Sequence, residues 1–557
     1  MAQTQATLAP TGGVSPGQVS ALLSYVLFIS LWLYAELLEY RKRHFYLRAR
    51  SDQHAHDEEN GKHTPPLVKE PSLGSPSAAT RVEYTFMGSG FAQCLMLKQK
   101  ALLDSRIYLR AAVEFGTIML WYYMVDRTSV FSYGKKHYSR DVLSFIFLVL
   151  TAVNLWKALR TYNKGPDLLN RQQTDEWKGW MQVLFLLYHY FNAREIYNAI
   201  RVFIAGYVWM TGYGNFLYYY HYKDFSLGRF CQMMWRLNFL VTVTCVVLEN
   251  SYMLYYICPM HTIFTVFVYA CLALGAKYNA SATGIWLKIA GCFTLIYVCW
   301  DIKPVFYALW SPFTFLMGYN DPRKPTDDLL HEWHFRSSLD RYVWIHGMIC
   351  AYMKPWAEGV LVRIDNMAFR ARIAMRALLL AGTLAVLAAW YQNIYTLPKI
   401  EYNKVHPYTS WIPITVWIVL RNLTPSLRTY SLGIYGWLGT ITLETYISQF
   451  HTWLTTGIPD GQPKMLLTFL PYEDFPLLNF GMATAIYVFV SYRLFMLTGT
   501  LKTAVVPNKA GRELLRNVIL ITITGAFLWL VSALLIRLGG WQAVAAPLVD
   551  PMATRGQ

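Results

Sequence analysis

Residues 177–236 read WKGWMQVLFLLYHYFNAREIYNAIRVFIAGYVWMTGYGNFLYYYHYKDFSLGRFCQMMWR, which is two apolar helical segments, an aromatic stretch and a basic turn. On an α-helix, Lys178 and His189 share one face, with the histidine about 16 Å further along the axis. An ionisable side chain inside hydrocarbon is costly, so an intramembrane histidine indicates a functional site with polar partners nearby. The alternative is a histidine that only hydrogen-bonds neighbouring helices.

The basic turn after the second apolar segment carries Lys223, Arg229 and Arg236 among several tyrosines. Cations pair with phosphate and aromatic rings stack on a base, so this combination suits a ligand that has both groups. Positive charge at the cytoplasmic edge of a membrane is the alternative explanation, and it is strong for any one of the three residues.

The composition indicates a membrane protein. The chain has 557 residues, of which 55% are hydrophobic and 15% charged. Many apolar runs approach 20 residues, which predicts an all-α, polytopic transmembrane bundle. The net charge of +17 comes mainly from short loops between apolar runs, so it indicates membrane topology and not a nucleic-acid partner. The eight cysteines form no CxxC pair, and we expect no disulfide framework and no bound metal.

We count about fourteen spans, with 12 or 13 as alternatives. The predicted spans lie at 19–38, 107–125, 141–159, 177–194, 196–214, 233–249, 252–275, 284–302, 341–355, 371–391, 407–421, 430–455, 475–497 and 515–537. If the N-terminus is luminal, alternation places most of the basic loops in the cytoplasm, as the positive-inside rule requires.

The expected organisation has five parts. They are a luminal tail (1–18), a first transmembrane helix with a basic juxtamembrane segment (19–48), a disordered cytoplasmic linker (49–82), a polytopic membrane domain (83–540) and a C-terminal tail (541–557). The linker is assigned from its polar, low-complexity composition, which offers too little apolar surface to fold alone.

Several long motifs resemble known acetyltransferases. They include DEWKGWMQVLFLLYHYF (175–191), KDFSLGRFCQMMWRLN (223–238), YMLYYICPMHTIFT (252–265), LLHEWHFRSSLDRY (329–342) and ITLETYISQFHTWL (441–454). These motifs are similar to the plant reduced wall acetylation family and to the membrane domains of fungal capsule O-acetyltransferase and animal sialate O-acetyltransferase. More distantly, the Lys178–His189 spacing is similar to the arginine–ten residues–histidine pattern of the acyltransferase-three superfamily. Here lysine keeps the charge of arginine but lacks its planar fork.

The resemblance implies a multi-pass protein of the Golgi membrane with an acyltransferase-three-like core. Such a protein moves acetyl from cytosolic acetyl-CoA to luminal cell-wall polysaccharide hydroxyls, for example of xylan or pectin. It delivers acetyl directly, or through a carrier or separate luminal polysaccharide O-acetyltransferases. Membrane lipid is the other expected partner. The alternative function is a transporter that supplies acetyl-CoA or acetyl to separate luminal enzymes.

Three residues are the candidates for catalysis. His189 is expected to act as the general base or as the nucleophile that holds the acetyl group. Lys178 is expected to polarise the thioester oxygen or to help bind coenzyme A. His261 follows Pro259, and a proline kink in a membrane helix can aim a neighbouring side chain into a cavity. On the same resemblance, Arg229, Arg236 and Lys223 are the candidates for the phosphates of coenzyme A.

The candidates for acceptor binding lie in two polar blocks. The first comprises Glu332, His334, Arg336, Asp340 and Arg341. These residues form either an acceptor site or a salt-bridged structural cluster. The second comprises Glu444 and His451, which lie two helical turns apart on one face and form either a proton route or a buried structural pair.

Overall fold

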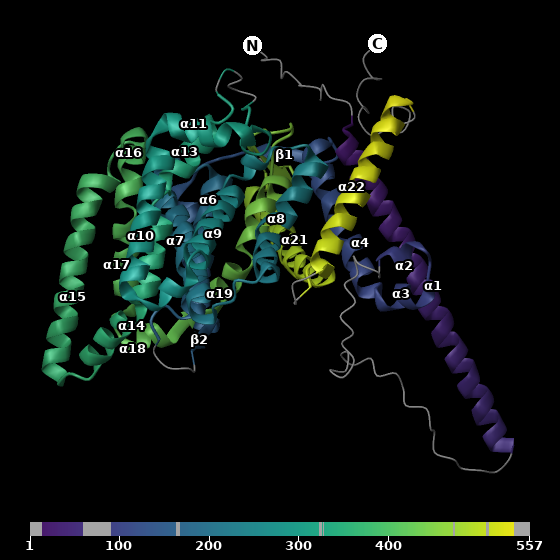
Figure 1. Ribbon diagram of the computed structural model, residues 1–557, viewed down its shortest axis with the longest axis horizontal. Coiled ribbons are helices and arrows are strands. Elements are labelled where there is room, and N and C mark those ends of the chain that lie inside the picture. The colour runs from purple at the N-terminus through teal and green to yellow at the C-terminus, as the bar shows by residue number, and fades with distance from the viewer. Residues whose placement is uncertain are drawn as a thin grey trace. The chain divides into compact units, whose positions relative to one another are not determined.

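The computed structural model describes residues 14–59, 91–162, 167–321, 326, 328–471, 474–507 and 512–539. These residues are mostly helical, with a few short strands (Figure 1). They divide into two compact units. The described parts of Met1–Leu120, Ser226–Arg236 and Met496–Gln557 form the first, and those of Trp121–Phe225 and Leu237–Phe495 form the second.

The first unit contains long helices and a small apolar core. Its elements are α1 (Pro16–Glu59), α2 (Phe91–Leu95), α3 (Gln99–Asp104), α22 (Arg512–Arg537) and parts of α4 (Arg106–Arg127), α8 (Leu227–Leu248) and α21 (Pro476–Val505). Leu31, Ala35 and Leu38 of α1 pack against Phe91 and Leu102. These contacts give the first unit an apolar core of its own.

Helix α1 extends further than the sequence predicts. Residues 49–59 belong to α1, so the first part of the expected linker is helical, and that prediction was wrong there. The segment from 46 to 59 contains no Gly or Pro, so nothing in it breaks the helix. The rest of the expected linker, 60–82, lies outside the described residues.

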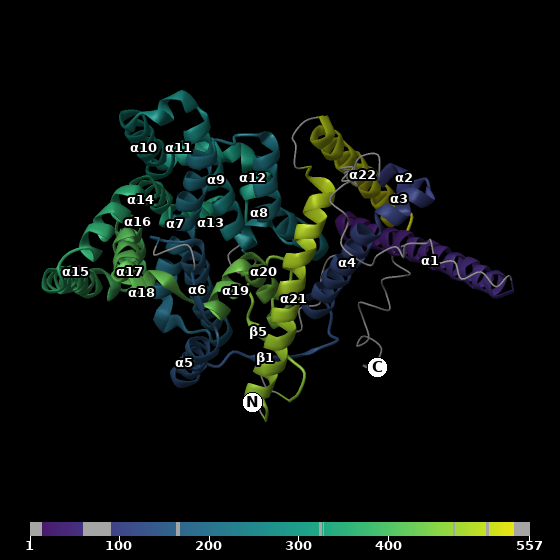
Figure 2. The same ribbon diagram turned by 90° about the horizontal axis from the view of Figure 1, so that it is seen from below.

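The second unit is a bundle in which α6 packs against α19, and α7 packs against α9 and α14 (Figure 2). Its helices are α5 (Arg140–Lys157), α6 (Arg171–Phe191), α7 (Tyr197–Tyr222), α9 (Ile257–Ala273), α10 (Ala282–Ile296), α11 (Lys303–Trp310), α12 (Thr314–Met317), α13 (His331–Leu339), α14 (Val343–Asp365), α15 (Phe369–Trp390), α16 (Lys399–Thr409), α17 (Trp411–Asn422), α18 (Pro425–Thr429), α19 (Gly433–Thr440) and α20 (Thr442–Ser448). Trp177, Trp209 and Trp344, from α6, α7 and α14, are buried at its centre.

Short strands and π-helical turns join these helices. Strands β1 (Ser132–Lys135), β5 (Met465–Thr468) and β4 (Leu454–Thr455) form an antiparallel sheet in the order β1-β5-β4, with Ser132 opposite Thr468 and Leu454 opposite Leu466. Strands β2 (Leu159–Thr161) and β3 (Tyr430–Leu432) form a second antiparallel pair. The π-helical turns are η5 (Tyr297–Asp301), η7 (Tyr391–Tyr395) and η8 (Gln449–Trp453), and the 3₁₀ turns are η2 (Arg194–Ile196), η3 (Tyr252–Tyr255), η4 (Ala276–Ala280) and η6 (Ser311–Phe313).

The predicted all-α membrane fold is confirmed. Every predicted span overlaps helix, but the span at 430–455 was wrong as a continuous helix, because α19, α20 and η8 divide it. In the described residues, six helices are long and apolar enough to cross a membrane: Pro16–Phe45, Leu227–Leu248, Ala282–Asp301, Phe369–Tyr395, Pro476–Val505 and Arg512–Arg537. The count of fourteen spans stays a prediction.

Glycine allows the close contact between α7 and α14. A Cβ at Gly212 would lie 1.9 Å from the carbonyl oxygen of Trp344, and one at Gly347 would lie 2.2 Å from that of Trp209. Inside a membrane the hydrophobic effect does not drive helices together. Van der Waals packing provides much of the association energy instead, and small residues allow it by letting two backbones approach closely. The two glycines therefore fix the distance between the two helices.

Replacing Gly212 with alanine tests this contact. We expect Gly212→Ala to destabilise the protein by about 1–3 kcal/mol, because the added methyl must displace backbone. Gly214→Ala is the matched control, since a Cβ there meets no heavy atom within 4 Å. Thermal unfolding of the purified protein in detergent measures both. Equal melting temperatures for the two variants would show that the contact is not a tight one.

Candidate functional site

His189 lies in the last turn of α6, which ends at Asn192 in the left-handed conformation, with a φ of 54°. The half-buried imidazole makes edge contacts with the rings of Phe185, at 4.7 Å, and Tyr188, at 5.1 Å. Among the described residues it forms no ion pair with a carboxylate and no hydrogen bond through either ring nitrogen. Both nitrogens therefore retain their capacity for chemistry.

Lys136 holds the backbone of this histidine. Its Nζ donates to the carbonyl oxygen of His189, at 2.9 Å, and to that of Pro463, at 2.8 Å. The charges of Lys136 and Arg336 both act on the His189 ring. Cations without a compensating carboxylate favour the neutral imidazole, which is the form that accepts a proton or attacks a carbonyl.

His451 lies in a different environment, fully buried within a closed hydrogen-bond network. Its Nδ1 is 2.9 Å from Asp126 Oδ2, and its Nε2 contacts the hydroxyl of Tyr255. Asp126 also accepts from Arg127 Nη1, at 2.6 Å, and from Thr455 Oγ1, at 2.7 Å. These bonds occupy the carboxylate and both ring nitrogens. They also join the end of α4, which carries Asp126, to η8 and to the strand that follows it.

Sequence reasoning paired His451 with Glu444 and missed Asp126 and Tyr255. The partners of His451 lie 196 and 325 residues away along the chain, and no local spacing indicates them. The available signal was the lone aspartate of YYMVDRT at the end of a predicted span. Glu444 is fully buried in α20, but the switch to η8 alters the rotation per residue, so the two-turn argument for a shared face does not apply.

His261 belongs to α9 and contacts α7, where its Nδ1 is 2.6 Å from Thr211 Oγ1. The charge of Asp340 acts on this ring. Asp340 itself pairs with Arg201, at 2.6 Å, and lies 3.4 Å from His406 Nε2. His261 is therefore next to a buried ion pair that links α7 to the segment after α13.

The polar block at 331–342 is divided among separate contacts. Glu332 and Arg336 pair at 2.8 Å along α13, and Arg336 also stacks on the ring of Tyr256 at 4.6 Å. Arg341 pairs with Asp301 at 2.8 Å, while the His334 ring packs on Phe306 at 4.6 Å. The ion pairs match the structural-cluster alternative, and they leave an acceptor role untested.

The comparisons with known proteins decide the family. Residues 25–519 match the model of the 10 TM acyl transferase domain found in Cas1p. The chain belongs to this family.

A curated relative of this Cas1p-type acyl transferase domain is the N-acetylneuraminate (7)9-O-acetyltransferase of Danio rerio. It is 30% identical over 444 residues, which cover 76% of this chain and 54% of the relative, so the chain spans about half the length of that protein. No solved structure matches the chain. The predicted acyltransferase function and the likeness to sialate O-acetyltransferase are confirmed, whereas membership of the plant family stays a prediction.

An acyl transferase domain needs a donor site, and the predicted cofactor residues belong to both units. Lys223 ends α7 in the second unit, with its side chain exposed. Arg229 and Arg236 lie two turns apart on α8 in the first unit. Lys178 pairs with Asp175 at 2.6 Å. The assignment of these cations to coenzyme A stays a prediction. Among the described residues no cluster of metal-ligating side chains occurs.

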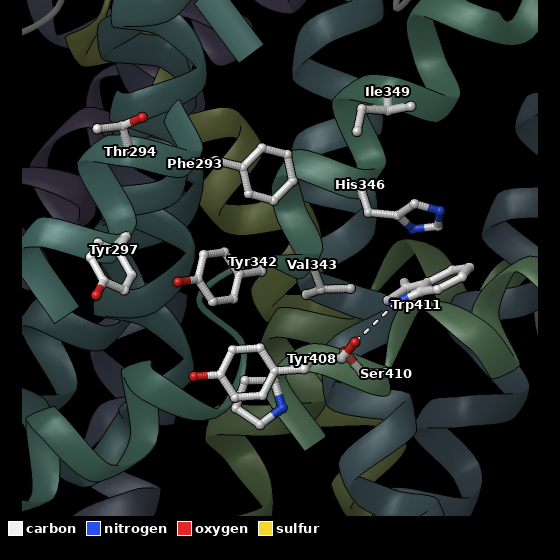
Figure 3. A pocket seen from close by; sticks show the side chains of 11 residues that line it. Phe293, Thr294, Tyr297, Tyr342, Val343, His346, Ile349, Tyr408, Ser410 and Trp411 are labelled. Atoms are coloured by element: carbon white, nitrogen blue, oxygen red, sulfur yellow. Dashed lines mark hydrogen bonds between the residues drawn. The ribbon is translucent and has the colours of Figure 1, made fainter. Parts of the chain in front are cut away.

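A cavity of about 670 Å³ lies elsewhere in the second unit, between α10, α14 and the junction of α16 and α17 (Figure 3). His346 lines it, with its Nε2 3.2 Å from Thr415 Oγ1. His189 and His261 are not among the lining residues. The cavity is thus a feature separate from the histidine that the sequence singles out.

The Lys136 contact predicts a pH dependence. Burial lowers the pKa of the Lys136 amine to about 8, so its two hydrogen bonds lose their charge above that pH. Charge-assisted bonds are about twice as strong as neutral ones, and we expect acetyl transfer to fall as the pH rises through 8. Lys136→Arg should keep its activity to higher pH, and Lys136→Met should be weak throughout.

Two controls separate this effect from unfolding. Lys135→Met removes an exposed neighbouring charge and should follow wild type. A lysine whose folded pKa lies below its unfolded value of about 10.4 makes folding more favourable as pH rises from 8 to 10. Melting temperatures should therefore not fall across the window in which activity does. A wild-type pH–rate profile without an inflection near 8 would contradict the role of Lys136.

Proposed function

We propose that this chain transfers acetyl from cytosolic acetyl-CoA to hydroxyl groups on the luminal side of the membrane, with His189 at the reacting centre. The family and the O-acetyltransferase relative support acyl transfer to oxygen. The observation that favours His189 is its ring, which has no carboxylate or hydrogen-bond partner among the described residues. His451, in contrast, has both nitrogens occupied.

Two routes use such an imidazole. As a general base, a ring nitrogen takes the proton of the acceptor hydroxyl while the oxygen attacks the thioester carbonyl. The carbon–sulfur bond then breaks, and the proton passes to the leaving thiolate. As a nucleophile, the same nitrogen attacks the carbonyl, releases coenzyme A and holds the acetyl group until the hydroxyl takes it.

The position of His189 suits transfer across the membrane. Lys178 lies near the start of α6, and the imidazole lies about 16 Å further along the helix. We propose that coenzyme A enters from the Lys178 end, with Lys223, Arg229 and Arg236 binding its phosphates. The acceptor approaches from the His189 end, where Arg336 acts on the ring and where Glu332 and Asp340 lie in the same polar block.

The acceptor follows from the plant-type resemblance. We propose a cell-wall polysaccharide hydroxyl, such as one on xylan or pectin, in the Golgi lumen. Delivery through separate luminal polysaccharide O-acetyltransferases belongs to the same proposal. The zebrafish relative is named for N-acetylneuraminate, which is likewise a sugar hydroxyl acceptor.

The test uses purified full-length protein in lipid nanodiscs with radiolabelled acetyl-CoA and xylan oligosaccharides. We expect His189→Ala to lower transfer by about 10²-fold or more, which is the usual contribution of a positioned base or nucleophile. His137→Ala is the matched control, because His137 is an exposed histidine beside Lys136. Label retained on the protein in the absence of acceptor would favour the acetyl-histidine route.

Equal transfer by wild type and His189→Ala would overturn the assignment and direct attention to His261. Binding of acetyl-CoA and passage of the intact molecule into sealed vesicles, without release of coenzyme A, would instead establish transport. Transfer to sialic acid but not to xylan would correct the acceptor alone.

A further inference from the structure

The cavity in the second unit runs along α14. Its lining includes Val343, His346 and Ile349, whose spacing of three residues forms one stripe on the helix, about 9 Å long. Figure 3 shows Phe293 and Thr294 of α10 along the other side. The cavity therefore follows the axis of α14 for about two turns.

Aromatic rings form two walls of this space. On one side, the Phe293 and Tyr342 rings stack at 5.9 Å, and Tyr342 and Tyr408 follow at 5.8 Å. On the other, His346 and Trp411 lie 6.0 Å apart. Apart from a few hydroxyls and the imidazole, the occupant meets carbon.

The cavity opens beside aromatic residues that are partly exposed. Phe293 is 38% exposed, Trp411 47% and Tyr297 57%. Helix α10 and η5 together form the candidate span Ala282–Asp301, so we expect the outward sides of Phe293 and Tyr297, which lie within it, at the level of the bilayer. The mostly apolar lining favours a hydrocarbon occupant over water.

A polar group borders one end of the cavity. Tyr342 and Tyr408, which line the cavity, donate their hydroxyls to Asp301, at 2.7 and 2.9 Å, and Asp301 pairs with Arg341 behind this lining. Asp301 ends the span and Arg341 precedes α14, so this group lies at the membrane surface. Phe293 and Ile349 lie at the opposite, apolar end, one or two turns deeper.

We propose that this cavity binds a zwitterionic phospholipid, with one acyl chain between α10 and α14 and the headgroup at the Asp301–Arg341 pair. The polar end carries both signs of charge in one ion pair, which matches a headgroup with one phosphate and one cation. Arg341 also stacks on the rings of Tyr342 and Tyr408, at 5.1 and 5.0 Å, which holds its positive charge at that end of the cavity. Phosphatidylcholine fits these features, and the proposal does not depend on the acetyl-transfer function.

The test is photolabelling of full-length protein in phosphatidylcholine vesicles. The probe is phosphatidylcholine with a diazirine in one acyl chain, and labelled peptides are mapped by mass spectrometry. We expect label on 342–349 and on Phe293 or Thr294. Thr294→Trp should reduce that label by about fivefold or more, because the indole occupies space that the chain needs in a close-packed site.

Leu295→Trp is the matched control, since Leu295 is exposed on the same helix and does not line the cavity. It should label as wild type. If Thr294→Trp unfolds at a lower temperature than wild type, Ile349→Phe is used in its place, because it fills the cavity from the α14 side. Label spread evenly over the outward faces of α10 and α15 would overturn the proposal, as would label unchanged by both fillings. Labelling of 342–349 by a diazirine sterol but not by phosphatidylcholine would also overturn it.

Discussion

Hydrocarbon cannot solvate charge, and that constraint accounts for the arrangement of the second unit. Two of its buried ion pairs join different elements. Arg201 of α7 meets Asp340 after α13, and Asp126 of α4 meets His451 of η8. Losing one member of such a pair leaves an uncompensated charge, which costs about 3–5 kcal/mol. The pairs therefore determine which helices can lie side by side.

Backbone contact then fixes how closely these helices approach. A Cβ at Gly179 of α6 would lie 1.8 Å from the carbonyl oxygen of Tyr435 in α19, so no larger residue fits there. Glu176, one turn earlier on α6, pairs with Arg421 at 3.0 Å and accepts from the backbone N–H of Leu432 at 2.8 Å. Helix α6 is thus fixed near its start by these contacts and at its end by Lys136. A helix held at both ends gives His189 a defined position without a bond to its ring.

The sequence allowed prediction of what depends on local pattern. Apolar runs located the helices, and the 178–189 spacing placed Lys178 and His189 on one helix. Local pattern could not reveal contacts between distant segments, such as the Asp126–His451 pair or the Arg341–Asp301 pair. The predicted helix at 430–455 failed at both ends because those ends pair as strands with segments outside the run, Tyr430–Leu432 with Leu159–Thr161 and Leu454–Thr455 with β5. The apolar run itself does not show such pairing.

The surroundings of His189 determine which charges an acetyl transfer at its ring can develop. A histidine–carboxylate pair, like that of His451 and Asp126, stabilises the imidazolium that a general base becomes. His189 has no such partner among the described residues, and the charges of Lys136 and Arg336 act on it instead. Those cations oppose positive charge on the ring, which either route develops, because protonation of the ring and acylation of one of its nitrogens both leave it cationic. The same cations stabilise the negative charge that forms on the thioester oxygen in both routes. Under the proposed function, the surroundings therefore keep the imidazole neutral until the acetyl donor arrives and then stabilise the oxyanion, by whichever route the ring acts.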